Sequence, residues 1–205
     1  MKVSYLTWVV NDALPNDLLW YPQSAQAFDI QSFLIQRGGF LKDYSVDGVP
    51  YSDWLATKCS NSNLNPKVIL VNLQKEQSAL TRPLPPDNVL NRILGYGMTD
   101  SGDMKQYYGF AKQHEQAILD ITKDFAKYKA LARQPEMIID SGLVKIRPSN
   151  AMTSMLYEYT PWSGAPCSIW TAKWGGIHGV YLFWKLWTQY WPEDLKEVMH
   201  IEPKW

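Results

Sequence analysis

The sequence of 205 residues lacks the spacings that mark common metal and redox sites. Its two cysteines, Cys59 and Cys167, lie far apart and form no CxxC motif, and its three histidines show no paired spacing. These patterns exclude the usual zinc-binding motifs, so we expect neither a metal nor a cofactor. The two cysteines fit either one long-range disulfide or two buried thiols.

An excess of charge of one sign and long apolar runs are also missing. Lys and Arg total 20, as do Asp and Glu, and no dense basic run occurs, which excludes a surface that follows nucleic acid phosphates. No apolar stretch is long enough to span a bilayer, and the short apolar run near the N-terminus is followed by no clear cleavage site. We therefore expect no membrane span, with either a removed leader or delivery by a phage.

Aromatic residues, by contrast, are plentiful: the chain has 10 Trp and 12 Tyr. Aromatic faces stack on sugars, but they also fill cores. Trp184, Trp187 and Trp191 recur at helical spacing and are expected in the core. Trp162, Trp170 and Trp174 lie in a segment with Gly, Ser and Pro. They fit two roles equally well: an exposed surface for a glycan or a partner, or ordinary packing.

Apolar periodicity predicts a mainly α (α+β) chain with little strand signal. Asn65-Pro66 is a strong helix start and Gly38-Gly39 a helix end. We expect an extended N-terminal arm over residues 1–23, a single domain over 24–205 and a small β-hairpin between residues 84 and 102. Helices are expected over residues 24–36, 53–59, 66–80, 108–133, 151–160 and 180–190.

One acidic residue lies on an apolar helix face. On the helix after Pro66, Glu76 is in line with the apolar stripe rather than with Lys67 and Lys75, which we expect on the solvated side. Low dielectric disfavours a charged carboxyl, so such a group keeps a proton for a leaving oxygen, as a general acid requires. A salt-bridged, structural Glu76 is the alternative. The face is formed by Ile69, Leu73, Glu76 and Leu80.

Several segments together resemble a known family. They are SAQAFDIQSFLIQRGGFLKDY, NPKVILVNLQKEQSAL, GYGMTDSGDMKQYYGFAKQ, NAMTSMLYEYTPW and VYLFWKLWTQYW, which span residues 24–191. The chain resembles bacterial secreted and phage-associated lysozyme-like domains, distant relatives of goose-type lysozymes and lytic transglycosylases. The resemblance implies a lysozyme-like helical fold and cleavage of peptidoglycan.

The resemblance also implies roles for particular residues. The essential Glu of that superfamily ends a core helix, which is the position of Glu76. Lytic transglycosylases have Ser directly after it, whereas here Gln77 intervenes before Ser78, so the subtype stays open. Gln113 loosely matches a residue that lines the sugar cleft, and Tyr159 or Tyr157 matches a late tyrosine near the Glu. Tyr96 and Tyr108 are expected to stack on sugars or to pack in the core.

Cleavage of a glycosidic bond commonly needs a second carboxylate. Asp87, Asp100 and Asp103 follow Glu76, and Asp100, in the segment GYGMTDSGD, is the preferred candidate, although Asp beside Ser and Gly is also ordinary turn chemistry. Without a second carboxylate, the 6-hydroxyl of the substrate attacks and leaves a 1,6-anhydro end. His114 lies on an apolar helix stripe and is expected to be structural.

The sequence thus predicts a muramidase or lytic transglycosylase that cuts the bond between N-acetylmuramic acid and N-acetylglucosamine. Its expected partner is the peptidoglycan glycan strand, bound outside the cytoplasm by a monomer. A non-catalytic wall- or glycan-binding module with the same fold is the first alternative, and a structural component is the second.

Overall fold

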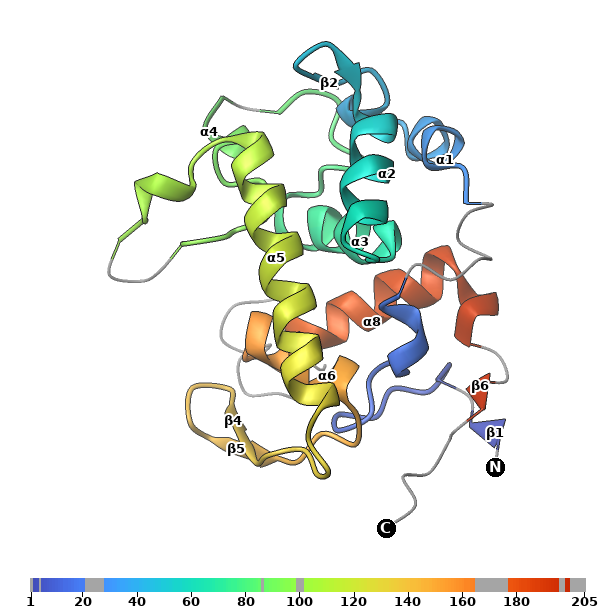
Figure 1. Ribbon diagram of the computed structural model, residues 1–205, viewed down its shortest axis with the longest axis vertical. Coiled ribbons are helices and arrows are strands. Elements are labelled where there is room, and N and C mark those ends of the chain that lie inside the picture. Colours follow the sequence, from blue (N-terminus) through green and yellow to red (C-terminus); the bar gives the residue numbers. More distant parts are fainter. Residues whose placement is uncertain are drawn as a thin grey trace. The chain divides into compact units, whose positions relative to one another are not determined.

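The computed structural model describes residues 2–3, 5–20, 28–85, 87–98, 102–164, 177–195 and 198–199 (Figure 1). This part of the chain is mainly helical with short antiparallel strand pairs, which confirms the expected α+β class. Each helix in it is too short or too polar to cross a bilayer. The chain forms two compact units: a central unit, residues 19–122, and a terminal unit, residues 1–18 with 123–205.

The central unit begins with two helices whose ends follow from local sequence. Helix α1 (Ile30–Arg37) starts at Asp29, whose carboxylate accepts a hydrogen bond from Ser32 N at 2.9 Å. It stops at Gly38, where φ is 80°, a left-handed conformation that favours glycine. A 3-10 turn (Phe40–Lys42) and a two-stranded ribbon of β2 (Ser45–Val46) and β3 (Val49–Pro50) lead to α2 (Tyr51–Asn61).

Helix α3 (Pro66–Gln77) is buried through most of its length. The Asn65 side chain accepts a hydrogen bond from Lys67 N at 3.0 Å, and Pro66 occupies the first turn, as the sequence predicted. All residues from 68 to 73 are buried. A helix that is buried on every side in its middle leaves only its ends within reach of solvent.

The prediction of a β-hairpin between residues 84 and 102 is wrong for the part of that segment that the structure describes. The short helix α4 (Asp87–Leu90) is followed by successive turns, in which Arg92 N, Gly95 N and Met98 N bond to carbonyls three residues earlier. Gly95 and Gly97 have φ of 69° and 71°, which suits turns and not strands. A 3-10 turn (Lys105–Tyr107) then leads to α5.

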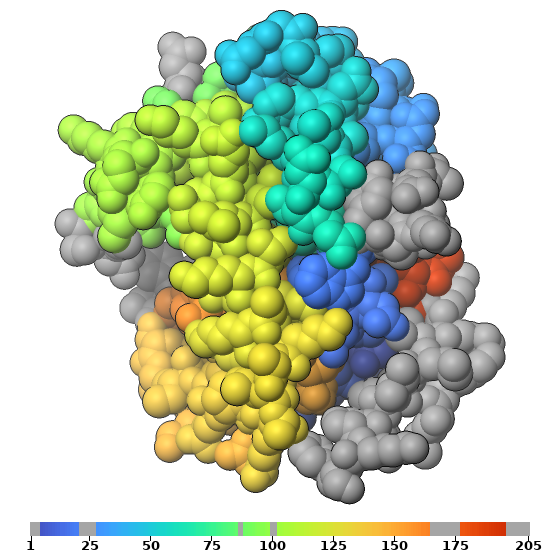
Figure 2. Space-filling view, in the orientation of Figure 1, coloured from blue at the N-terminus to red at the C-terminus, as the bar shows by residue number. Residues whose placement is uncertain are grey.

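Helix α5 (Phe110–Lys129) carries the buried stripe that its 3.6-residue period predicted. Its N-terminal half packs beside α2, because His114 bonds to Tyr51 and Lys58 pairs with Glu115 (Figure 1). Its other side is open to solvent, as the yellow-green to yellow surface in Figure 2 shows. The buried residues of the stripe are Phe110, Gln113, His114, Ala117, Ile118, Ile121, Phe125 and Tyr128.

The terminal unit is built on the helices α6 (Ala151–Tyr159) and α8 (Gly179–Tyr190). Its strand pairs are β4 (Met137–Ile139) with β5 (Val144–Ile146), and β1 (Lys2–Val3) with β6 (Val198–Met199). Asn150 caps α6 through Thr153 N, as predicted. Trp184, Trp187 and Trp191 are buried, which confirms them as core residues.

The expected N-terminal arm is part of the terminal unit over its described residues 5–18. Tyr5, Ala13 and Leu14 are buried. Tyr5 O accepts a hydrogen bond from Trp184 Nε1 at 2.8 Å, and Ala13 N donates to Thr153 Oγ1 at 3.0 Å. The segment therefore packs against α6 and α8 rather than standing apart as an arm.

Candidate active site at the end of helix α3

The C-terminal end of α3 is braced on both sides. Ser78, with φ of 53°, turns the chain out of the helix, and its N–H bonds to Gln74 O at 3.0 Å. The Gln74 side chain accepts from Leu80 N at 3.1 Å, which fixes the following residues. Gly39 N bonds to Leu80 O at 3.0 Å, and a Cβ at Gly39 would lie 2.5 Å from the Leu80 carbonyl carbon. This position therefore requires glycine.

Glu76 lies one residue before that end, with 27% of its side chain exposed. Its Oε1 forms an ion pair with Lys75 Nζ, and its Oε2 faces Gly95, where a Cβ would lie 3.1 Å away. The carboxylate is thus held between a lysine and a turn, at the edge of the protein interior. Its position at the end of a buried helix is the one that the sequence predicted.

The surroundings of Glu76 differ from the prediction in one respect. Ile69, Leu73 and Leu80 are buried as expected, but Lys75 is not on the solvated side, because only 6% of its side chain is exposed. Its ammonium instead contacts the Glu76 carboxylate. Sequence periodicity missed this contact, since neighbouring residues of a helix ordinarily point in different directions.

A second polar group on α3 was also missed. Asn72 lies one turn before Glu76 and is 2% exposed, and its Oδ1 has no hydrogen-bond partner within the described part of the chain. Residues four apart share a helix face, so Asn72 and Glu76 belong to the same side of α3. A buried polar atom without a partner is uncommon and marks a position to test for function. The sequence did contain a signal for this position, because Asn72 is a polar residue between the apolar residues Val71 and Leu73 of the motif VNLQKE.

Gln113 positions the turn beside Glu76 and is unsuited to bind substrate. Its Oε1 accepts from Leu94 N at 3.3 Å and from Tyr96 N at 3.0 Å, while its Nε2 donates to Tyr96 O and Tyr107 O, each at 2.8 Å. The side chain is 0% exposed and uses both donors and both acceptor positions. The prediction that Gln113 contacts a sugar is therefore wrong. Gln113 instead acts as a clamp, since its side chain holds the turn in place by hydrogen bonds to the backbone.

Tyr96 is half-buried and sits on the turn that Gln113 holds. Its hydroxyl donates to Asp120 Oδ2 on α5, and its ring packs edge-on against Tyr107 with centroids 4.9 Å apart. Gly97 makes room for this packing, since a Cβ there would lie 2.6 Å from Tyr107 Cδ2. Tyr96 thus remains a partly accessible aromatic residue next to Gly95, and its sugar contact stays a prediction.

Tyr108 belongs to a polar cluster with Arg92 and Asp103. Its hydroxyl donates to Asp103 Oδ2 at 2.7 Å and accepts from Arg92 Nη2 at 3.0 Å, and Arg92 forms an ion pair with Asp103. The hydroxyl is thereby occupied, which leaves only the ring for stacking. Asp103 is held as a paired carboxylate, and the preferred candidate, Asp100, lies outside the described residues.

The two late tyrosines have different positions on α6. Tyr159 is its last residue and half-buried, and it belongs to the terminal unit, whereas Glu76 belongs to the central unit. Tyr157 is buried, and its hydroxyl donates to Val10 O at 2.8 Å. Burial raises the pKa of Tyr157 above its ordinary value. Tyr157 is thus a core residue, and Tyr159 remains the candidate.

His114 is structural, as predicted. It is 0% exposed, its Nδ1 donates to Phe110 O at 2.8 Å, and its Nε2 accepts from Tyr51 Oη at 2.9 Å. Burial lowers the pKa of His114 to about 4, so the ring is neutral at physiological pH. Cys59 is a buried free thiol, and burial raises its pKa; Cys167 lies outside the described residues. No group of three or more His, Cys, Asp or Glu suited to a metal occurs in the described ranges.

The fold and this site define a mainly helical protein with a lysine-paired glutamate at the end of a buried helix. The model of the family described as "LasA, N-terminal domain" matches residues 12–198, so the chain belongs to that family. The searches of curated proteins and of solved structures gave no match.

Proposed function

We propose that the protein acts on the bacterial cell wall as a lysozyme-like enzyme that cleaves peptidoglycan glycan strands, with Glu76 as the proton-transferring residue. Its family, the LasA N-terminal domain, supports a cell-wall role and action outside the cytoplasm. The observation that carries the proposal is the position of Glu76. It is a partly exposed carboxylate on the end of an otherwise buried helix, held between Lys75 and Gly95.

The geometry of Glu76 suits proton transfer to or from a bound sugar. A carboxylate fixed by its neighbours loses little freedom when substrate binds, and one exposed edge leaves room for an oxygen of the substrate. Glu76, as the general acid, donates its proton to the glycosidic oxygen as the bond from that oxygen to the anomeric carbon breaks. The carboxylate that remains then accepts the proton of the nucleophile, either water or the sugar 6-hydroxyl, as the nucleophile oxygen bonds to the anomeric carbon.

The experiment replaces Glu76 by Gln, which keeps size and hydrogen bonding but removes the charge and the proton. Purified peptidoglycan is digested and the soluble fragments are identified by mass. We expect release to fall by roughly 10²–10⁴-fold, the usual contribution of a general acid or base. Mass spectrometry of the wild-type products separates hydrolysis from 1,6-anhydro formation.

Glu115→Gln is the matched control. Glu115 is a half-exposed, lysine-paired glutamate in the same unit, and its Oε1 lies 2.6 Å from Lys58 Nζ. This variant should keep wild-type release, and circular dichroism should show the same helix content for both variants. Wild-type release by Glu76→Gln would refute the catalytic role.

A glycan-binding module without catalysis is the second candidate. The ion pair of Glu76 with Lys75 favours it, because a salt-bridged structural glutamate is the alternative to a catalytic one. In that case the protein sediments with insoluble peptidoglycan but releases no soluble fragment, and Tyr96→Ala weakens sedimentation whereas Glu76→Gln does not.

A further inference from the structure

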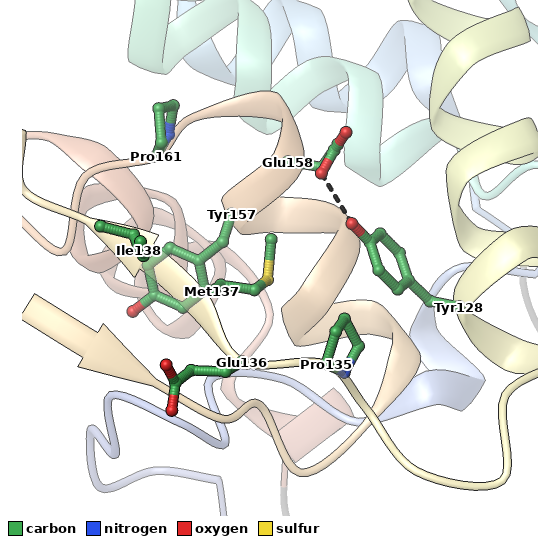
Figure 3. A pocket seen from close by; sticks show the side chains of 8 residues that line it. All are labelled: Tyr128, Pro135, Glu136, Met137, Ile138, Tyr157, Glu158 and Pro161. Atoms are coloured by element: carbon green, nitrogen blue, oxygen red, sulfur yellow. Dashed lines mark hydrogen bonds between the residues drawn. The ribbon is translucent and has the colours of Figure 1, made fainter. Parts of the chain in front are cut away.

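The terminal unit contains a cavity of about 390 Å³ beside the ribbon of β4 and β5 (Figure 3). Ligand pockets in proteins span roughly 300–1,000 Å³, so this one has room for an amino acid side chain or a dipeptide. It lies between the end of α5, the β4 segment and the end of α6. Its lining residues are Tyr128, Pro135, Glu136, Met137, Ile138, Tyr157, Glu158 and Pro161.

Glu136 and Glu158 are the charged members of this lining. Their lysine partners lie outside it: Lys145 Nζ is 3.3 Å from Glu136 Oε1, and Lys127 Nζ is 3.7 Å from Glu158 Oε1. The two lysine side chains are 68% and 55% exposed, and such surface pairs contribute little to stability. A ligand cation can therefore replace them at small cost.

Glu158 is held in place by Tyr128. The buried Tyr128 hydroxyl donates to Glu158 Oε2 at 2.6 Å, and Figure 3 shows the two side chains pointing at each other. Burial and the neighbouring carboxylate raise the pKa of Tyr128, so the hydroxyl remains a donor. One oxygen of Glu158 is thus occupied, while the other lies 3.7 Å from Lys127 Nζ, which also lies 3.5 Å from the Tyr128 hydroxyl and 4.7 Å from the centroid of the Tyr128 ring.

An apolar surface separates the two carboxylates. In the view of Figure 3, the Met137 side chain and the Tyr157 ring lie between Glu158 and Glu136. Pro135 and Pro161 add further apolar surface. A ligand that matches this arrangement has a flexible aliphatic stem with a cation at its end, since the stem gains apolar contact and the cation reaches a carboxylate.

We propose that this cavity binds a lysine side chain presented by a peptide, with the ammonium on Glu158 and the stem over Met137. An ammonium is preferred to a guanidinium because arginine pairs best with both oxygens of a carboxylate, and Tyr128 already occupies one of them. This binding site is independent of Glu76 and of the proposed glycan cleavage.

The test titrates the full-length protein with acetyl-Ala-Lys-Ala-amide and follows the methyl NMR signals of Met137 and Ile138. We expect saturable shifts with a Kd on the order of millimolar, because the carboxylates are partly exposed. The peptide with Nε-acetyl-lysine should bind at least about five-fold more weakly, and the arginine peptide should also bind more weakly. Raised salt should weaken the lysine peptide further.

Two sets of variants assign the binding to the cavity. The double variant Glu136→Gln/Glu158→Gln keeps the shape and should raise the Kd of the lysine peptide at least about five-fold. Tyr128→Phe frees Glu158 Oε2 and should narrow the preference for lysine over arginine. Glu115→Gln, outside the cavity, should leave the Kd unchanged.

Equal affinity for the acetylated peptide, unchanged affinity of the double variant, or no shift of the Met137 signal at about 20 mM peptide would each overturn the proposal. Cell-wall cleavage is measured separately on the same variants. The double variant should cleave as the wild type does, so a failure of the lysine site cannot be confused with a failure of the role of Glu76.

Discussion

Two polar pairs in the central unit are built in opposite ways. Tyr51 and His114 are both buried, neutral and bonded to each other, and the second ring nitrogen of His114 is bonded to a backbone carbonyl. Lys75 and Glu76 form an ion pair, and the Glu76 carboxylate is partly exposed. A closed pair with every group bonded serves the fold. An ion pair at a helix end with one partly exposed carboxylate can still bind a ligand. For this reason Glu76, and not His114, is the candidate functional residue.

The largest effect on stability is expected for Gln113, the clamp that holds the turn beside Glu76. Gln113→Leu leaves two N–H groups and two carbonyl groups without their partner. Each buried group that loses its bond costs roughly 1–3 kcal/mol, and the half-buried ones recover part of this from water, so we expect a loss of about 4 kcal/mol. Urea unfolding measures it.

Gln116→Leu, three residues later on α5, serves as the control for the clamp. Gln116 is half-buried and makes one long bond to Asp120, at 3.3 Å. Its replacement should change the free energy of unfolding by less than about 1 kcal/mol. Equal effects of the two variants would show that Gln113 is not a clamp.

The closed pair should make the fold sensitive to acid. Folding lowers the pKa of His114 from 6.5 to about 4, so the unfolded chain binds a proton at a higher pH than the folded protein. The stability contribution is therefore present above pH 6.5 and is lost as the pH falls toward 4, by roughly 3 kcal/mol. Urea unfolding at several pH values tests this.

The double variant Tyr51→Phe/His114→Phe removes the titrating group together with its hydroxyl partner. It should flatten the loss of stability between pH 6.5 and 4, whatever its stability at neutral pH. A slope as steep as that of the wild type would mean that other groups, and not His114, cause the acid sensitivity.

Breaking the ion pair of Lys75 with Glu76 should lower the free energy of unfolding less than the changes above, but it should lower the activity measurably. Lys75→Met removes the cation, yet Glu76 can reach water, so we expect a loss of about 1 kcal/mol in stability. Release of peptidoglycan fragments should fall about ten-fold if Lys75 positions the carboxylate, with partial recovery in Lys75→Arg. The matched Lys58→Met variant, which breaks the exposed pair with Glu115, should change neither by a measurable amount.

Local signals in the sequence predicted some helix ends, because those ends depend on neighbouring residues. The helix expected from residue 24 instead starts at Ile30, after its cap Asp29, and the helix expected to reach residue 80 ends at Gln77. Asn65 with Pro66 and Gly38 fixed the ends of α3 and α1, as their caps show. The turns between residues 84 and 98 were missed, since their shape depends on Gln113, which follows later in the chain. The site was predicted only in part: Glu76 follows from helix periodicity, whereas the contact with Lys75 depends on how side chains fold back at a helix end.

The contact between Gly39 and Leu80 has a consequence for how this region forms. Two hydrogen bonds, Gly39 N to Leu80 O and Phe40 N to Arg82 O, join the chain just after α1 to the chain just after α3. They close a long loop that contains α2 and all of α3, and the entropy of that closure is offset only when the buried face of α3 packs. Loop and helix should therefore open together as one cooperative segment, with matching amide exchange rates from residue 40 to residue 80.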